Sequence, residues 1–487
     1  MMRINIQPIS NVLGVLMLIL GLVMMSCTFV SIYYQSGDGG ALFSSGAASS
    51  IFGILLWKYR FDTKAVAIRK TEGYLIVTLA WLLMGIFSAL PYYFSGVVSS
   101  MTDALFESYS GLTTTGATIF ADVEVLPQGI LLWRSLTHWL GGLGIIVLTV
   151  ALFPLLGIAG IELFVAESSG PTNDKIHPRI KETAKRLWYI YVGLTIIATA
   201  TYYFHGLGLF DAVNHAMSSL STGGFSTKNA SIAYYQNPAL EYSVMIFMLL
   251  GGTNFFVIYQ LYKMQWKVAW RNDEFRAYLT MLAIVISVIT LFVMSSTALG
   301  TEEAFRKVGF MVISMVTTTG FVNADYTTWS NFITAIFFLL LFAGACAGST
   351  SGGIKVIRHY VFAKNSVLEF KRLLHPRALI RIKVNKEIVA PRILTHILVF
   401  LLVYLFSFFM GFVLLASTGM ELLTAAGASA TALGNVGPAI GGLGPMDNFS
   451  AVPDAGKWIL SFLMVLGRLE LFTVLIIFTP YFWKANG

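Results

Sequence analysis

Charged side chains are scarce in this chain of 487 residues, because Asp, Glu, Lys and Arg together make up only 11% of it. Soluble domains carry about a quarter of such residues, so the composition excludes an ordinary soluble protein. Cysteines are scarcer still, since Cys27 and Cys346 are the only two and each lies inside an apolar run. Two isolated thiols exclude a disulfide framework and a cysteine-based metal site.

Catalytic and nucleic-acid-binding patterns are also missing. The seven histidines do not cluster with acids or cysteines, and no acid, base and nucleophile converge, so we predict that the chain is not an enzyme. His138 and His215 each stand alone and are expected to serve packing. The segment GSTSGGIK, 348–355, lacks the residue order of a phosphate-binding loop. The net charge of +8 is typical of basic cytoplasmic loops in a membrane protein, so we do not expect nucleic acid as a partner. We also expect no bound organic cofactor.

Apolar residues are abundant, at 56% of the chain. Stretches long enough to cross a bilayer, about 17–25 residues, predict about ten spans in an all-α polytopic membrane protein. They lie at 11–34, 41–57, 72–96, 131–158, 187–207, 239–262, 275–299, 330–362, 393–417 and 456–482. The first is too long for the apolar part of a signal peptide, so we expect a retained helix. Basic residues gather in one set of loops, which predicts that both termini are cytoplasmic.

Four shorter apolar pieces, at 102–113, 210–221, 303–317 and 421–433, are about half the length needed to cross. Such pieces are typical of half-helices that enter the membrane and return to the same side, here the outer side. Asp103 and Asp211 open the first two pieces with Asp-Ala, and we expect both to be helix N-caps.

Each short piece runs into a stretch that contains a glycine. These stretches are SGLTTTGA (110–117), SSLSTGGF (218–225), SMVTTTGF (314–321) and TALGNVGP (431–438). The spans that follow also correspond, through WLGGLG (139–144), LLGGTN (249–254), LFAGACAGSTSGG (341–353) and VLGRLE (465–470). The pattern predicts four parallel repeats of span, pore helix, glycine stretch and span around one pore, preceded by two extra N-terminal transmembrane helices.

The glycine stretches are predicted to form an ion filter. Extended backbone at membrane depth needs protein cover or a watery cavity, and its carbonyl oxygens can replace the hydration shell of a cation. The C-terminal ends of four short helices would favour positive charge at the same place. The simpler interpretation is that each stretch is only a helix C-cap and a loop. The predicted filter residues are Thr114, Thr115, Gly116, Thr222, Gly223, Gly224, Thr318, Thr319, Gly320, Asn435, Val436 and Gly437.

The four repeats and their glycines resemble the superfamily of bacterial Trk and Ktr and plant and fungal HKT/Trk potassium transporters, over essentially the whole chain. The length and the two extra spans are most similar to the membrane subunit of the bacterial Trk system. The resemblance implies a potassium-selective pore, a homodimer in the cell inner membrane, and a cytosolic nucleotide-binding regulatory subunit (TrkA-like). Some sodium-passing plant relatives have serine at the position of Gly116, so glycine favours potassium. Asn435 and Val436 depart from the threonine-rich form, which makes one wall of the filter unlike the others.

On this basis we expect the two extra spans in 1–65 and the repeats in 66–165, 166–270, 271–390 and 391–487. The third repeat is interrupted at mid-membrane by a glycine- and serine-rich segment, which predicts a movable plug; a tightly packed helix of small residues is the alternative. The family carries an intramembrane gating loop at this point. The segment comprises Gly344, Ala345, Cys346, Ala347, Gly348, Ser349, Thr350, Ser351, Gly352 and Gly353.

Arg468 lies in the middle of the last span, where charge is costly unless it faces a wet cavity or a partner. It is predicted to be an electrostatic barrier below the filter, and otherwise a structural arginine that holds carbonyls or a carboxylate. Acids at the outer mouth are expected to attract cations or to cap the short helices; they are Asp103, Glu107, Asp211, Glu302 and Glu421. The basic stretch Lys364–Arg392 could lie on lipid headgroups or dock a regulatory partner.

The favoured function is therefore potassium uptake across the cytoplasmic membrane through a gated pore, with potassium as the transported ion. A sodium- or proton-coupled potassium symporter on the same scaffold is the alternative.

Overall fold

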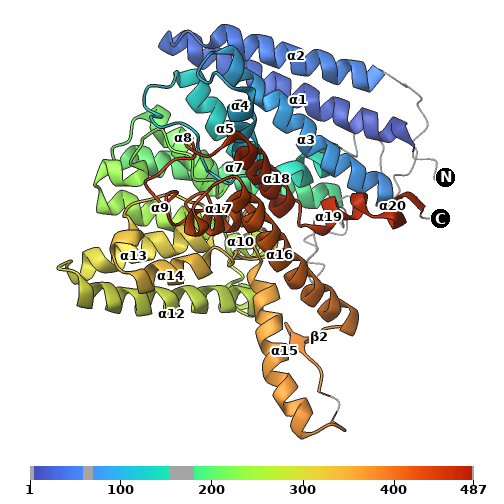
Figure 1. Ribbon diagram of the computed structural model, residues 1–487, viewed down its shortest axis with the longest axis vertical. Helices are drawn as coiled ribbons and strands as arrows, with labels where there is room; N and C mark the ends of the chain where they lie inside the picture. The colour runs from blue at the N-terminus through green and yellow to red at the C-terminus, as the bar shows by residue number, and fades with distance from the viewer. Residues whose placement is uncertain (1–4, 59–69, 153–179, 379, 485–487) are drawn as a thin grey trace.

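The computed structural model describes residues 5–58, 70–152, 180–378 and 380–484. These residues form a body of helices in which segments from both halves of the chain lie side by side (Figure 1). The strands named within the described ranges are the two short ones of a hairpin, β1 (Lys383–Val384) and β2 (Glu387–Ile388). The prediction of a helical protein with several apolar spans is therefore confirmed.

An N-terminal hairpin of two helices covers one flank of the body (Figure 1). Helices α1 (Ile6–Tyr34) and α2 (Gly39–Lys58) approach so closely that a side chain on Gly14 would meet the backbone of Gly53. Small residues permit such contact between membrane helices. The buried carboxylate of Asp38, between the two helices, accepts the backbone N–H of Ile130 at 2.7 Å. This bond ties the hairpin to the helix that begins at Gln128.

Six helices are long and apolar enough to cross a membrane by themselves, and two bent helix pairs raise the number to eight within the described residues. Besides α1 and α2, the long helices are α3 (Lys70–Phe94), α7 (Ile180–Phe204), α12 (Asp273–Ser296) and α16 (Pro391–Ser417). The predicted span 131–158 corresponds to α5 (Gln128–Leu152) and runs into 153–179, outside the described residues. The predicted boundaries at 65 and 165 also lie outside them, as do the bases Arg60, Lys64, Arg69, Lys175 and Arg179.

Four short helices occupy the positions of the predicted half-length pieces. They are α4 (Met101–Leu112), α8 (Leu209–Leu220), α13 (Thr301–Val316) and α17 (Leu422–Gly434). The prediction that Asp103 and Asp211 are N-caps is wrong, because Ser100 and Gly208 hold those positions. Both acids lie in the first turn instead, where a negative charge still stabilises the positive end of the helix.

The helix after each short helix is broken at the glycine-containing motif that the sequence repeats. Helix α5 has a non-helical residue at Gly144 (φ 57°), and α9 (Pro238–Gly251) turns by 111° into α10 (Phe255–Tyr262). Helix α14 (Asn331–Leu340) stops and gives way to a non-helical segment, 341–355. Helix α18 (Asp454–Arg468) bends by 106° into the segment Phe472–Phe478. All four breaks place backbone polar groups inside the protein.

Helix α15 (Val356–Leu374) leaves the body and, with the β-hairpin and the start of α16, forms an arm that projects from it (Figure 1). Its outer half exposes both basic and apolar side chains, including Phe370 and Leu374. The remaining elements are short: η1 (Ser231–Tyr235), α11 (Trp266–Ala269), η2 (Tyr326–Thr328), α19 (Phe472–Leu475), η3 (Ile476–Phe478) and α20 (Pro480–Lys484).

Candidate functional site: a ring of glycine stretches and the loop beneath it

Each predicted filter stretch begins as the C-terminal cap of a short helix. The backbone N–H groups of Thr115, Gly223, Thr319 and Val436 donate to carbonyls five residues earlier, at 2.9, 2.9, 2.8 and 3.1 Å. The residue before each of these donors has a left-handed φ, as in Schellman caps: Thr114 (54°), Thr222 (53°), Thr318 (57°) and Asn435 (54°). The simpler interpretation, that each stretch is a helix C-cap followed by a loop, therefore describes how each stretch begins. The caps also fix the point at which each chain leaves its helix.

The four glycines that follow form a closed cycle. They have positive φ angles, Gly116 80°, Gly224 82°, Gly320 79° and Gly437 97°, which residues with a Cβ rarely adopt. A Cβ on Gly116 would collide with the carbonyl oxygen of Gly223, and one on Gly224 with that of Thr319. A Cβ on Gly320 would meet the carbonyl oxygen of Val436, and one on Gly437 that of Thr115. Each repeat thus faces the next, and the fourth faces the first.

The carbonyl oxygens of the predicted filter residues are distinguished by their burial and their hydrogen bonding. Within the described residues, none of them accepts a hydrogen bond from a backbone N–H group, although most of these residues are fully buried. Buried carbonyls are paired in more than about 90% of cases. A ring of buried carbonyls that accept no backbone hydrogen bond is an arrangement that can coordinate a dehydrated cation.

Side chains behind the ring brace its four walls differently. The hydroxyl groups of Thr113 and Thr115 lie 2.8 Å apart, and those of Thr317 and Thr319 lie 2.7 Å apart. In the fourth wall the amide of Asn435 donates to Thr115 Oγ1 at 3.0 Å and to the Met464 carbonyl at 2.9 Å. The departure from threonine that the sequence shows there supplies a link between the fourth repeat and the first.

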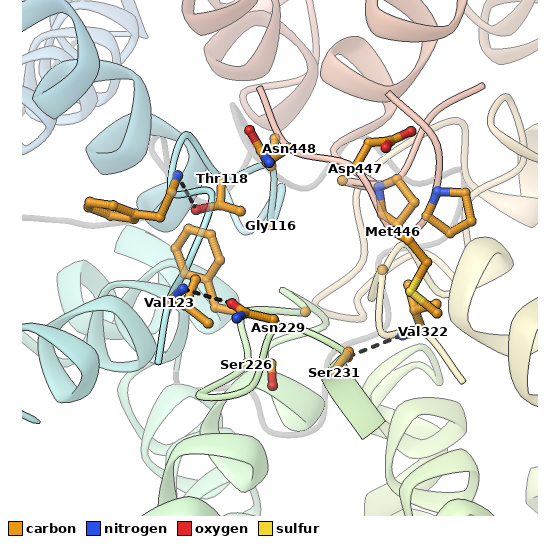
Figure 2. A pocket seen from close by; sticks show the side chains of 18 of the residues that line it. Gly116, Thr118, Val123, Ser226, Asn229, Ser231, Val322, Met446, Asp447 and Asn448 are labelled. Atoms are coloured by element: carbon orange, nitrogen blue, oxygen red, sulfur yellow. Dashed lines mark hydrogen bonds between the residues drawn. The ribbon is translucent and has the colours of Figure 1, made fainter. Parts of the chain in front are cut away.

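A cavity with an empty volume of about 750 Å³, here called the mouth cavity, opens on one side of the ring. All four ring glycines line it, and so do residues that follow the glycines in each repeat, as Figure 2 shows. The loops around it are joined across repeats: Asn229 accepts the Val123 N–H and donates to Asp122, each at 2.8 Å. This amide bond lowers the pKa of the Asp122 carboxyl.

The acids expected at the mouth are mostly neutralised. Glu107 is fully buried and forms a 2.8 Å ion pair with Arg134, which itself contacts the ring of Phe225 at 4.1 Å. The expectation that Glu107 attracts cations or caps a helix is therefore wrong. Asp103 pairs with Lys457 at 2.6 Å. Arg134 was missed, although a charge inside the apolar run 131–158 is itself a signal of function or pairing.

Three other acids remain to be placed. Asp211 accepts the Thr227 hydroxyl at 2.7 Å, and Glu302 pairs with Arg306 at 2.9 Å while remaining largely exposed. Glu421 is exposed at the start of α17 and has no capping side-chain bond. These acids thus lie near helix starts, as the sequence suggested.

The predicted gating segment, 344–353, lies directly against the ring on the side away from the mouth cavity. The N–H of Gly352 donates to Thr318 Oγ1 at 2.7 Å, and a Cβ on Gly352 would meet the Gly434 carbonyl. The segment is not a helix, which excludes the tightly packed helix that was the alternative. It is a compact loop whose ends meet, since the Gly344 N–H donates to the Ile354 carbonyl at 2.8 Å.

Thr350 is the most connected residue of this loop. Its hydroxyl group lies 2.9 Å from the Leu220 carbonyl, 3.0 Å from the Gly251 carbonyl and 3.3 Å from Thr222 Oγ1. Its N–H donates to the Gly251 carbonyl at 3.2 Å. A loop from the third repeat is thus attached to the short helix and the broken helix of the second.

Arg468 reaches the same loop from the fourth repeat. Its guanidinium donates to the Thr350 carbonyl at 2.7 Å, to the Gly142 carbonyl at 3.1 Å, and to the Gly141 carbonyl. Both sequence-based interpretations are compatible with this position, because the group lies beneath the ring and also holds carbonyls. Its neighbour Glu470 faces elsewhere and pairs with Arg358 at 2.6 Å.

The base of the loop is anchored to the arm formed by α15. The carboxylate of Glu274 accepts the Ala347 N–H at 2.6 Å and the Ile357 N–H at 3.3 Å. Arg358, near the start of α15, lies 3.8 Å from the ring of Phe400 besides its pair with Glu470. The loop and the start of α15 are therefore held by the same carboxylate, that of Glu274. Within the part of the chain that the structure describes, no group of His, Cys, Asp and Glu could hold a metal ion.

Comparisons with known proteins agree with this architecture. Residues 39–484 match the TrkH family model, described as a cation transport protein. The chain is 38% identical to the Trk system potassium uptake protein TrkH of Escherichia coli K12, covering 99% of this chain and 100% of that protein. It is 36% identical to TrkH of Halomonas elongata, with the same coverage. The crystal structure of the potassium transporter TrkH from Vibrio parahaemolyticus superposes with a TM-score of 0.88 at 34% identity, covering 99% of this chain and 100% of that one.

Proposed function

We propose that this chain, which belongs to the TrkH family of cation transport proteins, takes up potassium ions through the ring of Gly116, Gly224, Gly320 and Gly437. The observation that carries the proposal is the set of buried filter carbonyls that accept no backbone hydrogen bond within the described residues. A cation without its hydration shell supplies the missing partner for these oxygens. The relatives named above are called potassium uptake proteins, which supports potassium as the cargo.

The ring selects cations, and the loop 344–353 closes the path beneath it. Four short helices end at the ring, and their partial negative charges add to the attraction. The loop fills the space under three of the four walls through Thr350 and Gly352. Arg468 places a positive charge beside the loop, which raises the barrier for a cation. Flux requires the loop and this charge to move aside.

The surroundings of the pore follow from the same proposal. The long apolar helices lie in the inner membrane, with both termini and the α15 arm on the cytoplasmic side, as the basic loops favour. The matched relatives are members of a Trk system, which supports a cytosolic, nucleotide-binding regulatory subunit as the partner. That subunit acts on the arm, and the working assembly contains two copies of this chain.

Ion uptake into proteoliposomes tests the function directly. The reconstituted chain is expected to pass labelled rubidium and potassium down their gradients and to pass sodium far more slowly. Gly116→Ser is the matched variant, because its Cβ and hydroxyl collide with the Gly223 carbonyl and deform one wall of the ring. It should lower the potassium-over-sodium ratio. Equal ratios in parent and variant would contradict the filter.

The same vesicles separate the pore from the alternative, a coupled symporter. In a pore, potassium uptake continues without a sodium or proton gradient and stops when the potassium gradient is removed. Uptake that requires either of the other gradients would establish coupling. Complementation of a transport-deficient bacterium on low-potassium medium gives a second readout that does not depend on purification.

A further inference from the structure

The second wall of the ring lacks the side chain that the other three have. The residue before the ring glycine is Thr115, Thr319 or Val436 in three repeats, and Gly223 in the second. Gly223 does not have a positive φ, so its backbone conformation does not require glycine. The reason for glycine at this position must therefore be space.

The imidazole of His138, a residue of the first repeat, occupies that space. A Cβ on Gly223 would overlap the imidazole of His138, which lies on α5 and is fully buried. The sequence motif Leu-Gly aligns α5 with α9 and α18, and His138 then corresponds to Met248 and Met464. Among the three repeats aligned in this way, only the first has a polar ring at this position, and that ring faces the one wall that has no side chain at this point.

His138 also holds the backbone of the second wall. Its Nδ1 accepts the Phe225 N–H at 3.3 Å and lies 3.3 Å from the Ser218 hydroxyl. Its ring stacks on Phe225, with centroids 4.0 Å apart and an interplanar angle of 15°. It therefore touches the chain on both sides of Gly224. The Gly223 carbonyl faces Gly116 of the first wall, so His138 packs behind a carbonyl of the ring.

We propose that His138 is a positioning residue for ion selection: it replaces, from the first repeat, the side chain that the second wall lacks at Gly223, and it holds the Gly223 carbonyl in the ring. The packing expected of His138 is present, and the proposal adds a role in the ring to it. The inference rests on the proposed function of the ring and names the group that sets the geometry of one wall.

Two variants and their combination test the proposal in reconstituted full-length chain. His138→Ala removes the imidazole and its bond to the Phe225 N–H. It should lower the potassium-over-sodium permeability ratio about fivefold, because one lost hydrogen bond is worth about that factor. Gly223→Thr alone should abolish uptake, because the new side chain collides with His138. Combined with His138→Ala, the introduced threonine has room, and Ser221 offers it a hydroxyl partner like Thr113 in the first wall. The double variant should therefore recover much of both uptake and selectivity.

Two further variants make every outcome decisive. His138→Asn keeps an acceptor near the position of Nδ1 and should retain more selectivity than His138→Ala at equal amounts of folded protein. His205→Ala removes a histidine that bonds Ser243 at 2.9 Å, away from the ring, and should leave the ratio unchanged. The inference is overturned if His138→Ala leaves the ratio unchanged while Gly116→Ser lowers it, or if the double variant is no better than Gly223→Thr. If neither His138→Ala nor Gly116→Ser changes the ratio, the filter itself is refuted.

Discussion

The ring differs from the layer beneath it, which comprises the loop 344–353, Arg468 and the carbonyls that they contact, in what the four repeats contribute. In the ring, four repeats contribute the same parts: a left-handed cap residue, a carbonyl that lies against the glycine of the preceding repeat, and a glycine that touches the next repeat. In the layer beneath, the repeats contribute three different kinds of part. The third provides the loop 344–353, the fourth Arg468, and the first and second the carbonyls of Gly141, Gly142 and Gly251.

This difference follows from what each layer has to do. An ion without water needs ligands from all sides at similar distances, so the repeats must stay nearly equal in the ring. Closing a path needs one obstacle and one place to hold it, and four equal obstacles would crowd the axis. Under the proposed function, the repeats are therefore nearly equal at the ring that would bind the ion, and they differ one layer away. Three experiments break or sharpen this comparison.

The largest effect is expected from a substitution that makes one wall of the ring unlike the other three. In Gly320→Val, a β-branched residue must adopt a φ of 79° and collides with the Val436 carbonyl and Pro438. Potassium uptake should fall on the order of a hundredfold or more, because a wall that cannot close supplies no ligand (~2.7 kcal/mol or more in barrier height). Rubidium flux in proteoliposomes measures it.

Gly193→Val is the matched control for this prediction. Gly193 lies within α7, and a Cβ there has open space around it. Uptake should remain near that of the parent. Comparable losses in both variants, at equal amounts of membrane-inserted protein, would show that the effect comes from folding rather than from the ring.

A smaller effect of opposite sign, an increase in flux, is expected from shortening the loop 344–353. Deletion of Cys346–Thr350 is compatible with the fold because Gly344 packs directly on Gly352 and Gly353. The deletion leaves the ring glycines in place and removes one contact to the ring, that of the Thr350 hydroxyl with Thr222 Oγ1. Most of the selectivity should therefore persist while unregulated flux rises on the order of tenfold or more, which corresponds to ~1.4 kcal/mol or more of barrier. A deletion variant with flux as low as that of the parent would remove the loop from the gate.

The smallest effect is expected from substitutions of Arg468, which bonds the loop 344–353 at Thr350. Arg468→Ala removes both the charge and the bonds to Thr350 and Gly142, and flux should rise several-fold, at most about tenfold. Arg468→Lys keeps the charge but not the planar fork that reaches carbonyls of two repeats. Low flux in Arg468→Lys would identify the charge as the barrier, whereas flux as high as in Arg468→Ala would identify the carbonyl bonds. Loss of folded protein in both would leave Arg468 a structural residue only.

Much of the architecture could be predicted because it depends on local patterns. The four short helices lie where short apolar pieces indicated them, and the break in the third repeat lies where the glycine- and serine-rich segment indicated it, since both signals come from residues close together in the chain. The breaks in α5, after α9 and after α18 fall inside the predicted spans 131–158, 239–262 and 456–482, where the sequence analysis expected continuous helices. Partners could not be predicted in the same way. Glu107 and Asp103 looked like acids of a mouth, but their partners Arg134 and Lys457 lie 27 and 354 residues away. Pairing at such separation is decided by packing.

The sequence by itself determined that this chain is a membrane protein with four related glycine stretches, because hydropathy and repetition are properties of the chain alone. Only the tertiary structure decided that these stretches close into one cycle, that the loop 344–353 lies under it, and that the space beside Gly223 belongs to His138. These relations join residues of different repeats. Their energies come from contacts between surfaces that are far apart along the chain, and no local pattern encodes which surfaces meet.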